Sequence, residues 1–251
     1  MHILAIIGSP RKKGNTYKVT TAVEQLLKQQ KNVTVEYLFL SDTTLGSCVG
    51  CHNCIFKDEA TCPLDDDRDM ILAKMQQADG IIFAVPVYVM SVPAVMKNFI
   101  DHFAFLCHRP IFFHTYVMVI ATTGGWGEKK VITYMKDILS SWGMHIVSSI
   151  GLQTPPMEPV GTIIEQHKKK IQKATERFNQ AVHSGKPPKV GLFSVIQFRI
   201  FQKIIFEYPD AFEADVRFYE PLKNSGFYTD VPIAGYKKAI AFVFEKLFFR
   251  G

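Results

Sequence analysis

The stretch Gly8-Ser9-Pro10-Arg11-Lys12-Lys13-Gly14-Asn15-Thr16 decides how the first half of this chain is interpreted. It follows an apolar run at residues 2–7, which predicts a buried strand, and precedes residues 17–30, whose apolar side chains have helical spacing. Where a strand turns into a helix, the free N–H groups of the first helical turn and the helix dipole favour an anion. Ser9, Asn15 and Thr16 add short polar side chains there. The stretch therefore predicts a phosphate site; the alternative is an ordinary turn whose helix is capped by Asn15 or Thr16.

Two common phosphate-binding loops do not match this stretch. A Walker A loop has the pattern G-x-x-x-x-G-K-[ST], but here the second glycine falls one residue late and Asn15 stands where the lysine belongs. An NTPase is therefore not expected. The dinucleotide pattern G-x-G-x-x-G is also missing. What remains is a loop suited to a single terminal phosphate.

Predicted strands and helices alternate along the first three quarters of the chain. The strands are expected at residues 2–7, 33–40, 80–85, 116–121 and 145–152, and the helices at 17–30, 67–78, 93–106, 128–142 and 162–183. This order predicts an α/β fold with a doubly wound, five-stranded parallel sheet and helices on both faces. In such sheets ligands bind at the carboxyl ends of the strands. The loops at residues 8–16, 86–92 and 122–127 are expected there.

The composition of the chain changes near residue 184. Residues 184–190, Ser-Gly-Lys-Pro-Pro-Lys-Val, predict a linker. We therefore expect an α/β domain at residues 1–183, with a Cys-rich insertion at 46–64, and a linker plus a Phe-rich, mainly helical extension at 184–251. The extension is expected to pack on its own domain or on another subunit.

Overall composition limits the class of protein. The chain has 251 residues, of which 47% are hydrophobic and 21% charged, which indicates a globular protein. The net charge of +6 suits anionic cofactors or acidic partners, but the basic residues are scattered, so nucleic-acid binding is not expected. No apolar run is long enough for a transmembrane segment, and the first residues do not resemble a signal peptide. These features predict a cytoplasmic protein.

Four of the five cysteines form one cluster. Cys48, Cys51, Cys54 and Cys62 have the spacing C-x2-C-x2-C-x7-C. A C-x2-C-x2-C run is typical of an Fe–S cluster such as [4Fe–4S]. A zinc site with His52 as a further donor, or a loop without metal, stays open, whereas disulfides are not expected in a reducing cytoplasm.

Several separate motifs resemble those of the NADPH-dependent FMN reductase family. They are the loop at residues 8–16, then Pro86-Val87-Tyr88, Pro93-Ala94 and Lys97-Asn98-Phe99-Ile100-Asp101. Together with the four cysteines they resemble the iron–sulfur flavoprotein branch of that family, over residues 1–155. The resemblance implies a flavodoxin-like fold, bound FMN, and a homodimer or homotetramer with the flavin near a subunit interface.

The resemblance also assigns site residues. The phosphate positions match Ser9, Arg11, Gly14, Asn15 and Thr16, and the loop along the isoalloxazine ring matches Pro86, Val87, Tyr88 and Met90. Thr123, Gly124 and Gly125 match the loop that approaches the pyrimidine edge of the ring. Independently of the family, Tyr88 can supply an aromatic wall, and the glycines let backbone N–H groups come close. In each case the alternative is plain packing or a simple turn.

The combined expectation is an FMN-dependent oxidoreductase. NAD(P)H would be the hydride donor, and the acceptor would be the cysteine-bound cluster, a protein, or a small molecule such as a quinone. No catalytic base or nucleophile is expected, because the cofactor supplies the chemistry. Two alternatives stay open: a non-enzymatic flavin and Fe–S electron carrier, and a flavin-dependent redox sensor whose Phe-rich tail grips a partner or a membrane surface.

Overall fold

The fold is built around one parallel sheet. The computed structural model describes residues 1–186 and 189–249. Its strands are β1 (His2–Ile7), β2 (Thr34–Phe39), β3 (Gly80–Pro86), β4 (Tyr116–Thr123) and β5 (His145–Gln153). Their order in the sheet is β2-β1-β3-β4-β5, and each neighbouring pair is parallel. This arrangement confirms the predicted five-stranded, doubly wound sheet.

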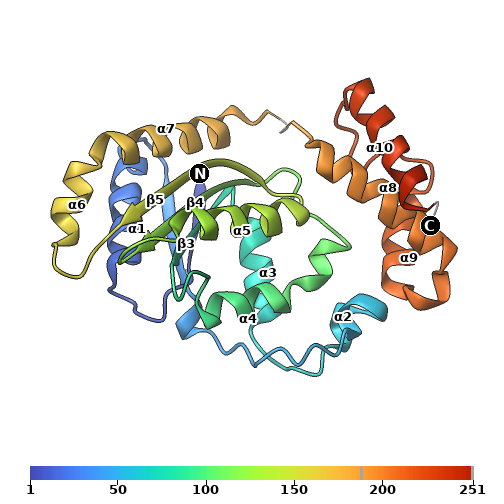
Figure 1. The fold of residues 1–251 in the computed structure, drawn as a ribbon, viewed down its shortest axis with the longest axis horizontal. Helices are drawn as coiled ribbons and strands as arrows, with labels where there is room; N and C mark the ends of the chain where they lie inside the picture. The colour runs from blue at the N-terminus through green and yellow to red at the C-terminus, as the bar shows by residue number, and fades with distance from the viewer. Residues whose placement is uncertain (187–188, 250–251) are drawn as a thin grey trace.

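Helices cover both faces of the sheet (Figure 1). One face packs against α3 (Arg68–Gln77), α4 (Ala94–His102) and α5 (Glu128–Ser141), and the other against α1 (Asn15–Leu27), α6 (Val160–Gln166) and α7 (Lys168–Ser184). Successive strand residues point to opposite faces, so Leu4 and Ile6 enter one core and Ile3 and Ala5 the other. Every residue of β3 and β4 is buried, as expected of strands covered on both sides.

Two predicted helices are shorter than the sequence pattern suggested. The helix expected at residues 93–106 ends at His102, and a tighter 3₁₀ turn follows at Ala104–Cys107. The helix expected at 162–183 is two helices that meet at His167, whose backbone leaves the helical region (φ −102°, ψ 12°). The break lets apolar side chains of both α6 and α7, such as Val160 and Phe178, reach the same face of the sheet.

The C-terminal part is helical and Phe-rich, as predicted. It contains α8 (Leu192–Glu207), α9 (Glu213–Tyr219) and α10 (Gly235–Phe248), which lie together at one end of the molecule (Figure 1). They form a hydrophobic cluster of their own, around Phe198 and Tyr219, which Phe113 of the α/β part joins. Ser184 of the predicted linker is the last residue of α7, and residues 187 and 188 lie outside the described part. The domain division at residue 184 stays a prediction.

The Cys-rich insertion contains a one-turn helix that the sequence analysis missed, α2 (Asn53–Phe56). It lies beside α9 in Figure 1, and the ring of Phe56 is 5.5 Å from the ring of Phe212. The extension therefore packs against the insertion. Among the described residues, no helix has both the length and the apolar character that crossing a membrane requires.

Candidate functional site

A pocket of about 150 Å³ lies at the carboxyl edge of the sheet. The three predicted loops meet there, and every predicted cofactor-binding residue except Met90 and Gly125 lines the pocket. Three further residues line it that the sequence analysis did not single out as binding residues: Thr122, Thr154 and Pro156. Thr154 and Pro156 follow β5, in a segment without a recognisable motif. Their position at the carboxyl end of a parallel strand is the one feature of the sequence that could have indicated a binding role.

The first loop presents the start of α1 to this pocket. Gly14 is the N-cap of the helix, and no side chain caps its first turn. The hydroxyl of Thr16 lies 2.7 Å from the hydroxyl of Thr122, and the Ser9 hydroxyl accepts a hydrogen bond from the N–H of Arg11 at 3.1 Å. The alternative of a turn capped by Asn15 or Thr16 is therefore not what the structure shows. The N–H groups of the first turn are left for a ligand.

The second loop contains a strained two-residue turn. Tyr88 and Ser91 pair through two backbone hydrogen bonds of 2.9 and 3.0 Å. Val89 (φ 47°) and Met90 (φ 64°) between them both adopt the left-handed conformation, which is unfavourable for a β-branched residue. Strain of this kind persists where the surrounding structure enforces it, and it concentrates at functional sites. The turn places Tyr88 in the pocket and leaves the Val89 side chain 99% exposed.

The third loop is held by Thr123. Its hydroxyl donates to the carbonyl of Trp126 at 2.8 Å and accepts from the N–H of Gly125 at 3.2 Å. The Gly125 N–H is thus used within the loop, and Gly125 does not line the pocket. Two exposed apolar residues lie near pocket residues in the sequence: Trp126 (74% exposed) comes shortly after Gly124, and Met157 (95% exposed) follows Pro156. Val89 and Met90 of the second loop are also exposed.

The four clustered cysteines line a second pocket, of about 310 Å³, next to α4. All the cysteines are free thiols, so the structure has no disulfide here. Burial raises the pKa of the Cys54 thiol, and the neighbouring Cys62, Cys48 and Cys51 add to the increase. In the described part of the chain, no three His, Cys, Asp or Glu side chains converge tightly enough to bind a single metal ion. The thiols surround a space larger than one ion.

Two polar side chains tie the cysteine loop to α4. The Asn98 amide accepts from the N–H of Cys48 at 2.9 Å and donates to the carbonyl of Gly46 at 2.7 Å. The buried His102 ring lies 3.0 Å from the Asp66 carboxylate, which also accepts from the N–H of Gly46 at 3.1 Å. Asn98 belongs to a motif noted in the sequence, but its role in the loop was missed.

A buried ion cluster ties the same loop to the C-terminal extension. Arg109 donates to the Cys54 carbonyl at 2.6 Å and to the Glu59 carboxylate at 2.7 Å, and forms a third hydrogen bond with Asp215 of α9. His108 lies 2.8 Å from the same Asp215 carboxylate, which is completely buried. Because the carboxylate has two cationic or polar partners, its burial is compensated. Nothing in the local sequence had indicated this cluster.

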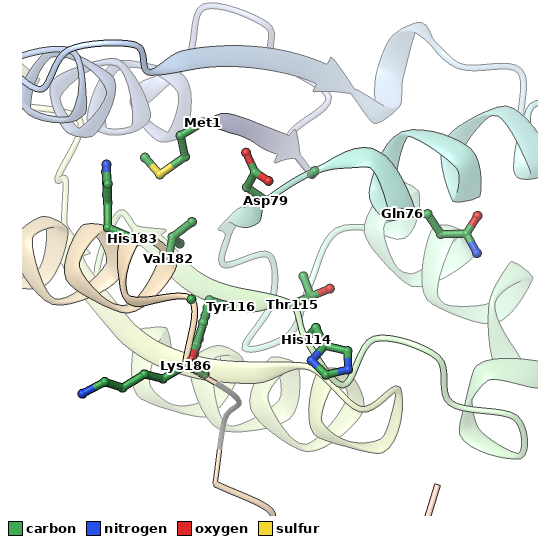
Figure 2. A pocket seen from close by; sticks show the side chains of 11 residues that line it. Met1, Gln76, Asp79, His114, Thr115, Tyr116, Val182, His183 and Lys186 are labelled. Carbon is green, nitrogen blue, oxygen red and sulfur yellow. Dashed lines mark hydrogen bonds between the residues drawn. The ribbon is translucent and has the colours of Figure 1, made fainter. Parts of the chain in front are cut away.

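A larger hollow, of about 670 Å³, lies at the opposite, amino-terminal edge of the sheet (Figure 2). Two of its polar groups are paired within the protein. The Asp79 carboxylate accepts from the N–H of His2 at 2.7 Å, and the Tyr116 hydroxyl donates to the carbonyl of Lys186. Figure 2 shows the His114 and His183 rings well apart on different walls, so this hollow brings no group of reactive side chains together.

Fold and pocket together define a class of protein. A doubly wound parallel sheet with the strand order β2-β1-β3-β4-β5 and a pocket at the carboxyl ends of its strands is a flavodoxin-like fold. Residues 1–155 match the family model of NADPH-dependent FMN reductase, and the chain belongs to that family. It is an NAD(P)H-dependent flavin oxidoreductase.

The relatives agree with this assignment. The chain is 32% identical over 188 residues to an iron-sulfur flavoprotein of Archaeoglobus fulgidus, covering 73% of this chain and 81% of that protein. It is 33% identical over 150 residues to an iron-sulfur flavoprotein of Methanosarcina thermophila, covering 59% and 77%. Among solved structures, RosB with bound 8-demethyl-8-formylriboflavin-5'-phosphate has a TM-score of 0.60 at 11% identity, covering 93% of this chain and 90% of RosB. That last likeness shows the fold alone.

Proposed function

We propose that this protein binds FMN in the pocket at the carboxyl edge of the sheet and passes electrons from NAD(P)H to an Fe–S cluster on the four cysteines or to a small acceptor such as a quinone. One observation supports this most: loops far apart in sequence, each predicted to contact FMN, line one pocket. Bound FMN would accept a hydride and release the two electrons singly. The protein's own residues bind, orient and shield it.

The phosphate of FMN would occupy the end of the pocket at α1. The uncapped first turn of α1 offers N–H groups and the positive end of the helix dipole. Arg11 adds a cation, and Ser9, Asn15 and Thr16 add polar side chains to the lining. The dinucleotide and triphosphate alternatives lack support, because this end of the pocket presents one helix start and no lysine at the Walker position.

The isoalloxazine ring would extend over the second and third loops. A pocket of about 150 Å³ is smaller than the roughly 300 Å³ or more of a typical ligand site, so part of the cofactor would lie outside it. The exposed side chains of Val89, Met90, Trp126 and Met157 are the apolar surface available to that part. A second copy of the chain that covered this surface would complete the site, which supports the homodimer or homotetramer that the family resemblance implies.

The cysteine pocket would hold a [4Fe–4S] cluster. Four thiols on one pocket are the donor set of such a cluster, and the iron-sulfur flavoprotein names of the relatives point the same way. Asn98 and Arg109 would hold the loop in place through the backbone of Cys48 and Cys54. Zinc or an empty loop are the competing outcomes.

A flavin analysis tests the proposal. Protein purified without oxygen is expected to be yellow, to release FMN on denaturation, and to lose its flavin absorption when NADH or NADPH is added. Release of FAD, or no flavin after reconstitution with FMN, would contradict the single-phosphate pocket. Colour that persists with both pyridine nucleotides would instead support the electron-carrier alternative.

Metal analysis tests the cysteine site separately. The same preparation is expected to contain about four iron and about four sulfide per chain, because a [4Fe–4S] cluster has that composition. Cys51→Ala should abolish both, since Cys51 lines the pocket, while its flavin content should stay as in the parent protein. Cys107→Ser is the matched control, because Cys107 lies outside the pocket and contacts Ser141. Zinc without iron would show that the cluster assignment is wrong.

A further inference from the structure

Helix α10 is an outer helix with one main neighbour. It packs against α8 at the end of the molecule farthest from α6 (Figure 1). Ala241 is its one fully buried residue, and Glu245 is held by an ion pair of 2.6 Å to Arg199 of α8. Near the start of the helix, Lys237 donates to the carbonyl of Val190 at 2.6 Å. Most other residues of α10 are exposed, so most of its surface faces outward.

That outward surface is apolar. Seven large side chains of α10 are between 37% and 63% exposed: Tyr236, Ile240, Phe242, Val243, Phe244, Leu247 and Phe248. The spacing of Tyr236, Ile240, Val243 and Leu247 places them on one side of the helix. Phe193 of α8, 62% exposed, is a further apolar side chain of this pair of helices. We call the seven α10 side chains the α10 face. Single exposed apolar residues are normal, but seven large ones on a helix of 14 residues mark an interaction surface.

The charges around the α10 face are mainly positive. Lys237, Lys238 and Lys246 lie on α10, whereas its one carboxylate, Glu245, is paired with Arg199. Four cations already lie over aromatic rings here. Lys246 and Arg199 are each 5.4 Å from the ring of Phe242. Lys203 of α8 is 4.0 Å from the ring of Phe249, and Lys237 is 5.9 Å from the ring of Tyr236. The positive charge of these lysines is not neutralised by carboxylates of α10, so the surface favours an anionic partner.

A second copy of the chain fits this surface poorly. The helix has 14 residues, which is two heptads, fewer than the three or four that argue for a coiled coil. Pairing α10 with its own copy would also bring lysines together without carboxylates to neutralise them. An interfacial helix needs neither length nor a complementary protein, since its apolar side chains enter the acyl boundary and its lysines reach the headgroups.

We propose that the α10 face docks this protein on an anionic lipid surface, with α10 lying in the plane of the interface. Phenylalanine, tyrosine, leucine and lysine are the residue types that such helices use. The attachment is peripheral, because no described helix could cross a bilayer. The inference rests on α10 and its charges alone and does not depend on flavin or cluster binding.

Vesicle flotation with the full-length protein tests the inference. The protein is expected to float with vesicles that contain phosphatidylglycerol and to bind at least about tenfold more weakly to phosphatidylcholine alone, because lysines near an anionic surface each contribute favourable energy. Val243→Ser/Leu247→Ser should weaken binding at least about tenfold, since two apolar side chains no longer enter the lipid. Both residues are more than half exposed in the free protein, so the variant is expected to fold normally. Lys238→Glu/Lys246→Glu should lower binding to the anionic vesicles specifically.

A control variant and two contrary outcomes complete the test. Met70→Ser/Ile111→Ser removes two exposed apolar side chains elsewhere and is expected to bind vesicles like the parent protein. Absence of binding to phosphatidylglycerol vesicles by the parent protein would overturn the inference. Light scattering that shows an oligomer of the parent protein, dissociated by Val243→Ser/Leu247→Ser, would also overturn it by making the α10 face an interface between copies.

Discussion

Replacing Arg109 by methionine is expected to lower the free energy of unfolding by about 3–5 kcal/mol. The guanidinium is the principal cation on Asp215, whose side chain is 0% exposed. Methionine keeps much of the aliphatic volume, so the cost comes from a carboxylate left in the interior with His108 as its remaining partner. For a chain of this length, 1 kcal/mol corresponds to about 2–4 °C in Tm, so urea and thermal unfolding would both register the change.

Two variants separate the buried charge from other effects. Arg217→Met removes an arginine at the same contact between the extension and the cysteine loop, but Arg217 is 58% exposed and pairs with Asp58 at the surface. Its loss should cost less than about 1 kcal/mol. The double variant Arg109→Met/Asp215→Leu should recover part of the stability, because no unpaired charge remains. An Arg109→Met protein as stable as the Arg217→Met protein would contradict the proposed role of the buried pair.

Replacing Asn15 by aspartate is expected to weaken FMN binding at least about 100-fold, which is about 2.7 kcal/mol. The two side chains have nearly the same shape, so the pocket should keep its form. The change places a negative charge at the start of α1, where the phosphate dianion is proposed to lie, and unit charges about 4 Å apart near a protein surface repel by up to about 4 kcal/mol. Titration of the flavin-free protein with FMN, followed by flavin fluorescence, measures the affinity.

The matched variants for this experiment are Asn15→Ala and Asn224→Asp. The Asn15 amide donates to the Thr154 carbonyl at 3.5 Å and is proposed to donate to the phosphate. Asn15→Ala removes this donor without adding repulsion, so its effect should be smaller, about tenfold. Asn224→Asp makes the same charge change at an exposed position of the C-terminal extension and should leave FMN affinity unchanged. An Asn15→Asp protein that binds FMN as tightly as the parent protein would show that the phosphate does not lie at this end of the pocket.

Most of the lining of the proposed flavin pocket could be predicted from short motifs. The loop at residues 8–16 and the segment around Tyr88 each lie directly after a buried strand, and parallel strands bring their carboxyl ends to one edge. Met90 and Gly125 were predicted to border the flavin ring, and that role stays a prediction. Neither lines this pocket, since Met90 lies in a turn and the Gly125 N–H is bonded to Thr123. Thr154 was missed because a lone threonine after a strand has no distinguishing pattern.

The cysteine loop shows a different limit. Its spacing was sufficient to predict that the thiols share one site, and the structure places all four on one pocket. No motif pointed to Arg109 or Asp215, which hold that loop although they lie 106 residues apart in the chain. A buried ion pair between distant segments leaves no periodic trace, since either residue alone is indistinguishable from a surface charge.

The order of strands and helices, the phosphate-type loop and the grouping of four thiols followed from the sequence by itself, because each depends on spacing within a few neighbouring residues. Only the tertiary structure decided where the Phe-rich extension packs and which side of α10 stays exposed. It also decided that Asp215 of α9 pairs with Arg109, which in turn binds the backbone of the cysteine loop. These features depend on which distant surfaces meet when the chain folds. Hydrophobic burial is non-directional, so an apolar pattern shows that a face needs a partner but not which partner it meets.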